Sequence, residues 1–294
     1  MTKASAPDIE LPSLDGFRRS DRGSITFIGT ATVLIRCAGF TILTDPNFLH
    51  RGEYVHLGYG LRSRRVTEPA MDLKDLPPVD FVLLSHLHED HFDRRVERDL
   101  DRALPIVTTS RAAAALAEKG FSRSIGLDTW GESSFVRDAA RLTITSMPGR
   151  HGPWLVSHLL PPVMGSMLEF READRVLLRL YISGDTLLYD KLGEIKRRYQ
   201  SIDQALIHLG GTSVLGLLVT MDGTQGVGLL KLLRPKVAIP IHFNDYTVFK
   251  SPLSDFQAEV RRAELETEVY YLDHGDSYSF EVPSPMTHTT KLAS

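Results

Sequence analysis

Seven consecutive residues of this chain hold three histidines and two carboxylates: Ser85-His86-Leu87-His88-Glu89-Asp90-His91. They directly follow residues 79–84, a short apolar run of β-prone residues, which predicts a buried strand that ends at the cluster. Unpaired imidazoles rarely crowd together at a strand end without a ligand to coordinate. The cluster therefore predicts a metal site, with a solvated, charged loop as the alternative.

The spacing within the cluster favours two metal ions over one. His86 and His88 are two residues apart and can turn to the same side of an extended segment, where they share one ion. Asp90 and His91 follow as the chain enters a predicted helix at 94–104, so they face a second ion beside the first. Imidazole and carboxylate ligands suit Zn²⁺ first, with iron and manganese as alternatives. We therefore expect a dinuclear site.

Length and composition predict one globular domain. The chain has 294 residues, of which 42% are hydrophobic and 24% charged, and no Pro/Gly/Ser-rich linker interrupts it. We expect a loosely ordered arm at 1–22, a single domain at 23–282 and a disordered tail at 283–294.

Charge and cysteine content exclude several classes of protein. The formal net charge of -3 provides no electrostatic footprint for nucleic acid or an anionic membrane. No signal-type segment opens the chain and no uncharged apolar run reaches bilayer length, so we expect a cytoplasmic protein without a transmembrane segment. Cys37 is the only cysteine, which excludes an internal disulfide and a thiolate metal cluster. We interpret it as a core residue on a strand.

Strand-like and helix-like runs follow one another along the chain. Strands are predicted at 24–28, 31–36, 40–43, 79–84, 105–108, 124–127, 134–137, 141–146, 166–170, 176–182, 203–208, 236–241, 269–272 and 277–280. The first three form an antiparallel meander. Helices are predicted at 94–104, at 111–119 with Ser110 as N-cap, between the turn at 183–186 and Tyr199, at 222–233 with Asp222 as N-cap, and at 252–263.

One regularity connects these strands to the metal cluster. Six polar residues stand where an apolar β-run gives way to a turn: Asp45, His86, His151, Asp185, His208 and His242. In layered α/β proteins the ends of such strands gather on one rim. The sequence therefore predicts that these six side chains lie close together.

Two segments are candidates for contacts with a substrate: residues 47–78, which have no clear period, and the covering segment at 154–170. Residues 47–78 are rich in aromatic and basic residues, and a long loop of this kind inside a domain is usually functional. Its arginines Arg62, Arg64 and Arg65 either bind a phosphate or carboxylate in bidentate fashion or form a solvated face. Residues 154–170 suit a substrate lid or a partner surface.

The order and spacing of these motifs resemble the metallo-β-lactamase superfamily. The anchors are the His-x-His-x-Asp-His block at 86–91, the Pro-Gly-Arg-His151 segment, the Ser-Gly-Asp185-Thr turn and the strand-terminal Pro-Ile-His242. The turns around Asp45 and Asp185 are most similar to the branch of ascorbate-6-phosphate lactonase and N-acylphosphatidylethanolamine-hydrolysing phospholipase D. Positions at which this branch often carries His, Asn and Tyr hold Thr30, Leu87 and Glu89, so the substrate does not transfer with the fold.

The resemblance implies an α/β fold, namely a four-layer αββα sandwich with two mixed sheets, helices outside and a dinuclear site on the rim. By position, it assigns the metal ligands His86, His88 and His151 to the first ion, Asp90, His91 and His242 to the second, and Asp185 as the bridge. It also assigns Asp45 to orient a ligand histidine, as metal-bound imidazoles usually require. Relatives often form homo-oligomers.

The same resemblance implies a metal-dependent hydrolase of a lactone, ester or phosphodiester in a small or medium-sized substrate. A hydroxide shared by the two ions is the expected nucleophile, and Asp90 is expected to pass a proton to the leaving group. The predicted catalytic residues are Asp90, Asp185 and His208, with a purely structural role as the alternative for His208. Two other functions stay open: a phosphodiesterase acting on a phospholipid-like substrate and a non-catalytic, metal-stabilised binding module.

Overall fold

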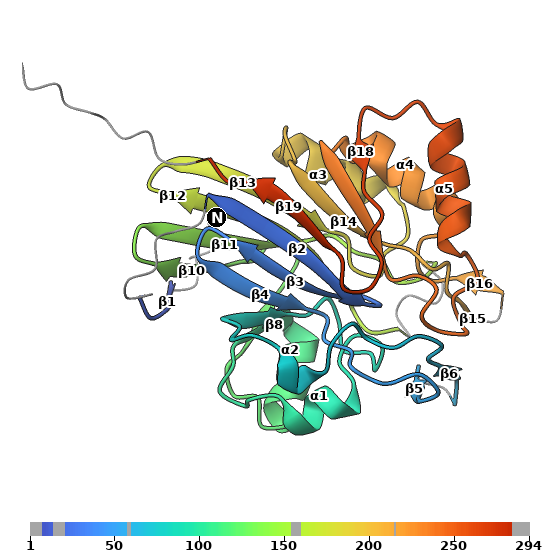
Figure 1. Ribbon diagram of the computed structural model, residues 1–294, viewed down its shortest axis with the longest axis horizontal. Helices are drawn as coiled ribbons and strands as arrows, with labels where there is room; N and C mark the ends of the chain where they lie inside the picture. The colour runs from blue at the N-terminus through green and yellow to red at the C-terminus, as the bar shows by residue number, and fades with distance from the viewer. Residues whose placement is uncertain (1–7, 14–20, 58–59, 154–159, 215, 284–294) are drawn as a thin grey trace, which may run out of the picture.

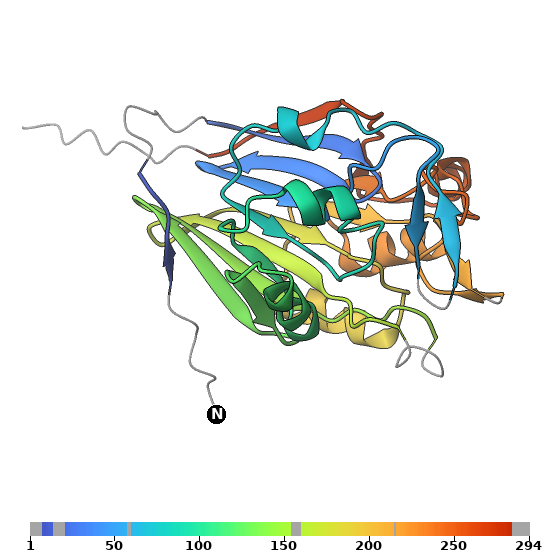
Figure 2. The same cartoon turned by 90° about the horizontal axis from the view of Figure 1, so that it is seen from below.

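The computed structural model of the protein describes residues 8–13, 21–57, 60–153, 160–214 and 216–283. Two large β-sheets lie face to face, and helices cover their outer sides (Figure 1). Seen from below, the blue strands of one sheet lie over the green and yellow strands of the other (Figure 2). The predicted αββα sandwich with two mixed sheets is confirmed.

The eight-stranded sheet combines an antiparallel and a parallel half. Its strands, in spatial order, are β1 (Ile9–Glu10), β10 (Glu132–Arg137), β11 (Ala140–Met147), β12 (Gly165–Glu172), β13 (Arg175–Ile182), β14 (Gln204–His208), β17 (Val237–Ile241) and β18 (Glu268–Val269). Pairing is antiparallel from β10 to β13 and parallel from β13 to β18. As a result, the C-terminal ends of β11, β13, β14 and β17 all lie on the same side of the sheet.

The seven-stranded sheet begins with the predicted meander. Its strands, in spatial order, are β19 (Ser277–Glu281), β2 (Arg22–Gly29), β3 (Thr32–Cys37), β4 (Phe40–Thr44), β7 (Phe81–Leu83), β8 (Ile106–Thr109) and β9 (Ser124–Leu127). Pairing is antiparallel from β19 to β4 and parallel from β4 to β9. β4 and β7 therefore end side by side, and each is followed by a polar residue of the predicted site.

The main hydrophobic core lies between the sheets. Phe81 of β7 and Phe135 of β10 are fully buried there, and their rings stack with centroids 4.1 Å apart. Cys37 is buried in the same core at the end of β3, as predicted. Apolar side chains from both sheets thus form one continuous layer between them.

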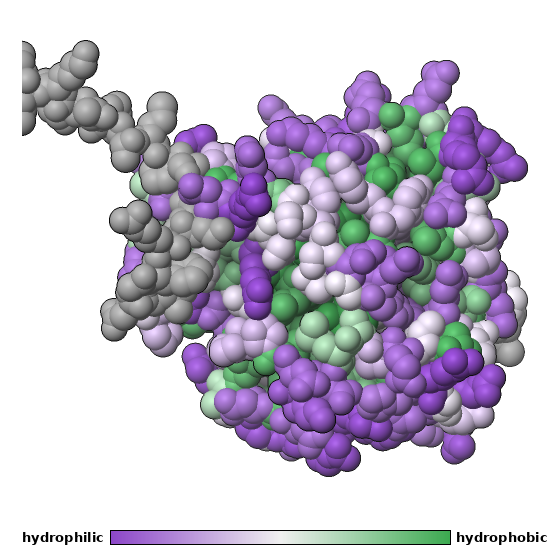
Figure 3. Space-filling view, in the orientation of Figure 1, coloured by the Kyte–Doolittle hydropathy of each residue, from purple (hydrophilic) through white to green (hydrophobic). Residues whose placement is uncertain are grey.

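Five α-helices complete the outer layers among the described residues: α1 (Arg94–Asp99), α2 (Ser110–Glu118), α3 (Gly193–Arg198), α4 (Gly223–Leu233) and α5 (Leu253–Arg262). α1 and α2 pack on the seven-stranded sheet, whereas α3, α4 and α5 pack on the eight-stranded sheet. On the face shown in Figure 3, hydrophilic side chains cover the region of α1 and α2. This is the polar outer side expected of amphipathic helices.

The segment without a clear period holds regular structure of its own. Within residues 47–78, β5 (Tyr54–His56) and β6 (Arg62–Arg64) pair as a hairpin, and η1 (Leu73–Asp75) is one turn of 3-10 helix. The other short elements are η2 (Asp190–Leu192), β15 (Ser213–Val214) and β16 (Leu217–Leu218). Strands of two or three residues, such as β5, β6, β15 and β16, are too short to produce a readable alternation in the sequence.

Three predicted details are corrected by the structure. The N-cap of α2 is Thr109, whose hydroxyl accepts a hydrogen bond from the amide of Ala112, so Ser110 is the first helical residue. α1 ends at Asp99 because Leu100 adopts an extended backbone while still packing in the core. The predicted strand at 269–272 is limited to β18, and Leu272 instead joins the central core.

The predicted arm, tail and covering segment fall partly outside the described residues, which omit 1–7, 14–20, 154–159 and 284–294. Within the arm, β1 pairs in parallel with β10, and β2 already begins at Arg22. Within residues 160–170, β12 occupies a central place in its sheet. No helix among the described residues is long and apolar enough to cross a membrane.

Candidate metal centre

Polar residues that follow six strands converge at one edge of the sandwich. They are Asp45 after β4, His86 after β7, His151 after β11, Asp185 after β13, His208 at the end of β14 and His242 after β17. These residues, together with His88, Asp90 and His91, form four groups in which the potential ligand atoms lie within 4.8 Å of one another. The structure therefore brings together side chains that are up to 197 residues apart, from Asp45 to His242.

The first group is His86, His88 and His151. Nε2 of His86 and Nδ1 of His88 are 2.9 Å apart. The Nδ1 atom of His151 faces the backbone carbonyls of Val219, at 3.0 Å, and Asp185, at 3.2 Å. Since a carbonyl only accepts hydrogen bonds, Nδ1 of His151 carries the proton and Nε2 carries the lone pair. Three imidazole nitrogens are thus available to one ion.

The second group is Asp90, His91 and His242. Oδ2 of Asp90 is 3.6 Å from Nε2 of His242, whose Nδ1 donates to the carbonyl of Leu209 at 3.1 Å. Asp185 lies between the groups, because its Oδ2 is 3.4 Å from Nε2 of His91 and its ligand atoms also group with His86. Asp185 therefore lies close to candidate ligands of both groups.

The donor atoms of this site fit a divalent cation. Four of them are buried and have no hydrogen-bond partner among the described residues: Oδ1 of Asp90, Nε2 of His91, Oδ1 of Asp185 and Nε2 of His242. Each buried polar atom left in this condition costs roughly 1–3 kcal/mol. A bound cation would satisfy the lone pairs that these side chains direct toward one another.

Burial and neighbouring charges shift the pKa values of the candidate ligands. Burial and the neighbouring histidines hold the pKa of His86 well below its usual value and lower the pKa of His88 to about 4, so both imidazoles are neutral. Although burial acts to raise the pKa of Asp185, charges on His242 and His91 hold it well below its usual value. Neutral imidazoles and ionised carboxylates are the forms that bind metal ions. Burial acts to lower the pKa of His91 and His242, but the charge of Asp185 raises both, so an ion that binds these two imidazoles would release their protons.

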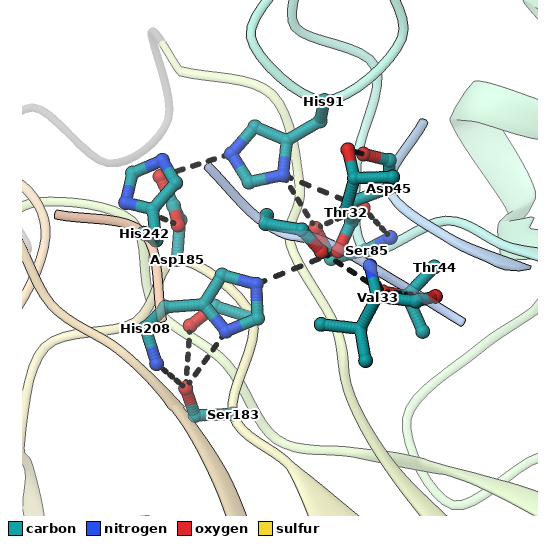
Figure 4. A network of polar contacts seen from close by, with 12 residues as sticks. Thr32, Val33, Thr44, Asp45, Ser85, His91, Ser183, Asp185, His208 and His242 are labelled. Carbon is teal, nitrogen blue, oxygen red and sulfur yellow. Dashed lines mark hydrogen bonds and ion pairs between the residues drawn. The ribbon is translucent and has the colours of Figure 1, made fainter. Parts of the chain in front are cut away.

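Asp45 supports the site from behind. Its Oδ1 accepts hydrogen bonds from the amide of Ser85, at 2.7 Å, and from the Ser85 hydroxyl, at 2.9 Å (Figure 4). The same carboxylate lies 3.4 Å from Nδ1 of His91 and 3.5 Å from Nε2 of His208. Burial acts to raise the pKa of Asp45, but the two histidines outweigh it and lower the pKa to about 2. The ionised carboxylate can therefore orient the His91 ring.

His208 is fully buried beside this carboxylate. Its ring lies parallel to that of His91, with centroids 5.9 Å apart, and its Nδ1 is 3.3 Å from the hydroxyl of Ser183. That hydroxyl also accepts a hydrogen bond from the His208 amide at 2.9 Å (Figure 4). His208 thus contacts Asp45 and Ser183, neither of which is one of the predicted metal ligands.

A second supporting network contains Asp245, which the sequence did not single out. The Asp245 carboxylate accepts a hydrogen bond from the amide of Thr30 at 2.7 Å, and the Thr30 carbonyl accepts one from the amide of His242 at 2.6 Å. His242 and Thr30 both have left-handed backbones, with φ of 61° and 53°. Non-glycine residues hold this conformation only where surrounding contacts impose it.

Arg65 behaves differently from Arg62 and Arg64. The latter two are exposed on β6, whereas Arg65 is fully buried, so neither of the two predictions for the arginine cluster describes it. Its Nη1 donates to the carbonyl of Asn47, at 3.1 Å, and to the Asn47 side-chain oxygen. The Asn47 amide group in turn donates to the carbonyl of Glu89 at 2.9 Å. Arg65 therefore anchors the loop that carries the metal cluster.

Comparison with known proteins agrees with this architecture. A family model described as a beta-lactamase superfamily domain matches residues 41–243, which is more than half of the chain. The N-acyl-phosphatidylethanolamine-hydrolyzing phospholipase D 1 of Caenorhabditis elegans is 27% identical over 248 residues, covering 79% of this chain and 67% of that protein. A metal-dependent hydrolase of Caldivirga maquilingensis is 25% identical over 255 residues, covering 86% of this chain and 96% of that protein.

Solved structures share the same fold. The isothiocyanate hydrolase from Delia radicum gut bacteria matches with a TM-score of 0.73 at 22% identity, over 88% of this chain and 99% of that one. A possible metal-dependent hydrolase from Veillonella parvula matches with a TM-score of 0.72 at 20% identity, over 87% of this chain and 98% of that one. With the strand order and the converging histidines, the family model leads to one conclusion: the chain belongs to the beta-lactamase superfamily.

Proposed function

We propose that this protein hydrolyses a lactone, ester or phosphodiester bond of a small or medium-sized substrate with two divalent metal ions, of which Zn²⁺ suits the donor set best. The observation that carries the proposal is the set of buried donor atoms on Asp90, His91, Asp185 and His242 that have no hydrogen-bond partner within the described ranges. Together with the His86, His88 and His151 group, they provide seven ligand side chains for two ions. This number leaves coordination positions open for water and substrate.

Each residue would have a distinct task. The imidazoles of His86, His88 and His151 would hold one ion, Asp90, His91 and His242 the other, and Asp185 would bridge them. When bound, the two ions would activate a shared water as hydroxide near neutral pH and polarise the oxygen of the scissile bond.

Proton transfer falls to Asp90. Asp90 lies in the same group as His91 and His242, and its Oδ1 is buried without a hydrogen-bond partner among the described residues. This oxygen can therefore accept a proton from the attacking water and return it to the leaving group. His208 would act through Asp45, which it contacts, by keeping that carboxylate aligned with His91. We therefore assign His208 a positioning role, as one of the residues that orient metal-bound imidazoles.

Metal analysis and a substrate panel test the proposal together. Protein loaded with Zn²⁺, Fe²⁺ or Mn²⁺ is analysed for bound metal and assayed with a lactone, an ester, a phosphodiester and a β-lactam. We expect about two ions per chain and turnover of at least one substrate other than the β-lactam. His88→Ala and Asp185→Asn lose an ion and the turnover, whereas His50→Ala, which changes a histidine outside the four groups, retains both.

Three results would contradict the proposal. A chain that binds no metal under any loading condition does not use these residues as ligands. Turnover that survives both His88→Ala and Asp185→Asn places the active site elsewhere. Full metal binding without turnover of the lactone, ester or phosphodiester would instead favour the metal-stabilised binding module.

A further inference from the structure

A cleft of about 460 Å³ opens beside His88, one of the candidate ligands of the first ion. It lies between the loop that carries the metal cluster, the helices α1 and α2, the end of β5 and the segment that follows residue 159. In the described part of the chain its lining residues are His56, Leu57, Leu87, His88, Glu89, Phe92, Glu97, Arg111, Lys119, Leu160 and Pro161. Its volume falls within the range of small-molecule sites.

One part of the lining is apolar. Leu57, Leu87, Leu160 and Pro161 are half-buried, and Phe92 is almost fully buried behind them. These side chains come from three separate segments of the chain, so the apolar surface is formed only by the folded structure. An apolar group seated there would remove this surface from water, which favours binding.

The charges of the lining are satisfied with one exception. Glu89 accepts a hydrogen bond from the ring of His56 at 2.9 Å, and Glu97 pairs with Lys119 at 2.8 Å. Arg111, on the first turn of α2, is exposed and makes no ion pair or side-chain hydrogen bond with any described residue. Its guanidinium group is therefore available to a ligand.

We propose that this cleft binds an amphipathic small molecule whose apolar body lies against Leu57, Leu87 and Leu160 and whose oxyanion pairs with Arg111. The planar fork of arginine matches the two oxygens of a carboxylate, sulfonate or phosphate. Because His88 lines the same cleft, we assign this molecule as the substrate, with its non-reacting part in the cleft. This assignment rests on the proposed hydrolase function. The cleft thus selects substrates with an apolar segment and a distal negative charge.

Binding of two fluorescent probes tests the cleft without requiring turnover. 8-Anilinonaphthalene-1-sulfonate carries an oxyanion on an apolar body, and N-phenyl-1-naphthylamine is its neutral counterpart. With the metal-loaded full chain, Arg111→Gln should weaken binding of the sulfonate about tenfold, the equivalent of about 1.4 kcal/mol, and change binding of the neutral probe less than about twofold. Arg111→Lys should restore part of the loss.

Two matched variants control for charge and for the apolar wall. Arg123→Gln removes the same charge from an exposed arginine outside the cleft and should leave both affinities unchanged. Leu57→Gln should weaken both probes. If Arg111→Gln binds the sulfonate as tightly as the unaltered chain, or if Leu57→Gln changes neither affinity, the proposal is overturned.

An ester pair links the cleft to the substrate. The 4-nitrophenyl ester of octanoic acid and the 4-nitrophenyl monoester of octanedioic acid differ only in a distal carboxylate. Arg111→Gln should lower the ratio of kcat/KM for the acidic ester over the neutral one about tenfold, while Arg123→Gln keeps it. An unchanged ratio overturns the assignment to substrate binding. Absence of all hydrolysis with intact probe binding would instead contradict the proposed function and leave the anion site standing.

Discussion

Individual side chains at the candidate metal centre depend on partners that are themselves buried. His91 faces Asp185 with one ring nitrogen and Asp45 with the other, at 3.4 Å in both cases. Asp45 has a left-handed backbone, with φ of 36°, and its carboxylate is held by the amide and hydroxyl of Ser85. The strained backbone and the fixed carboxylate together set the orientation of the His91 ring, which is the main requirement for a metal-binding imidazole.

Asp45→Asn tests this arrangement at the scale of one residue. The substitution keeps the size of the side chain but removes the negative charge behind His91. We expect the affinity for the second ion to fall roughly 10- to 100-fold, because loss of such a partner weakens the ligand that it orients. Titration of the metal-free chain with Zn²⁺ against a chelating indicator measures both affinities. An unchanged second affinity would show that Asp45 does not support His91.

At the scale of elements, one carboxylate connects a helix to the loop that precedes the hairpin. Asp93 is the N-cap of α1 and accepts hydrogen bonds from the amides of Arg95 and Val96. Its other oxygen accepts from the amides of Phe48 and Leu49. Asp93 itself is fully buried, and burial raises its pKa. The carboxylate therefore fixes the position of α1 relative to the loop after Asp45.

Asp93→Ala should be far more costly than loss of an ordinary cap. We expect the free energy of unfolding to fall by about 3 kcal/mol, about 1 for the cap and about 1 for each of the two loop amides left without an acceptor. Asp222→Ala is the matched control, because the Asp222 carboxylate caps α4 through the amide of Gln225. Its expected cost is about 1 kcal/mol. Urea unfolding measures both, and equal losses would contradict the connecting role of Asp93.

The turn before β19 is tied to the loop after β17 by an ion pair. Nε2 of His274 is 3.1 Å from Oδ1 of Asp245. Burial acts to lower the pKa of His274, but the hydrogen bond and charge of Asp245 raise it above 6.5. Burial likewise acts to raise the pKa of Asp245, and His274 contributes to holding it below 3.8. The pair is therefore charged on both sides across an interval of pH.

This pair predicts a pH dependence of stability. A histidine with a raised pKa contributes fully below 6.5, and the contribution is lost as the pH rises through the folded pKa. Asp245 contributes above 3.8, and that part is lost as the pH falls through its lowered pKa. The difference in unfolding free energy between the unaltered chain and His274→Gln should therefore shrink from about pH 6 to about pH 9. Urea unfolding at both values measures it, and a constant difference would exclude the ion pair as its cause.

At the scale of the whole molecule, the candidate ligands join the two sheets. His86, His88, Asp90 and His91 follow β7 of the seven-stranded sheet, whereas His151, Asp185 and His242 follow strands of the eight-stranded sheet. Each of the two proposed ion sites draws ligands from both sheets. A bound ion would therefore stabilise the packing of one sheet against the other, in addition to any role in catalysis.

Removal of metal should lower the melting temperature of the entire domain. An ion present at about a thousand times its dissociation constant stabilises the folded state by about 4 kcal/mol, so we expect chelation to lower Tm by roughly 10 °C or more. His88→Ala should show a smaller shift, since one ion is already weakened, whereas His50→Ala should show the full shift. Thermal unfolding with and without a chelator measures this, and an unchanged Tm would contradict a site shared between the sheets.

Much of this protein could be predicted from short-range patterns in the sequence. Apolar β-runs that end in Asp45, His86, His151, Asp185 and His242 indicated both the strands and the residues at their ends. The reason is that a strand buried on both faces needs a continuous apolar run, and chemistry-bearing side chains stand out at its boundary. The αββα fold followed from these motifs by resemblance, and the strand order confirms it.

Contacts between distant segments were decided only by the tertiary structure. Thr30 and Asp245 are 215 residues apart in the chain, and Arg65 is buried because Asn47 and Tyr246 close around it. Likewise, the cleft beside His88 combines side chains from four segments, among them Arg111, which makes no ion pair or side-chain hydrogen bond with the part of the chain that the structure describes. No local pattern encodes such contacts, because burial and hydrogen bonding depend on what the folded chain places beside each residue. The sequence alone thus determined which residues end the strands, and the packing of the two sheets determined what those residues meet.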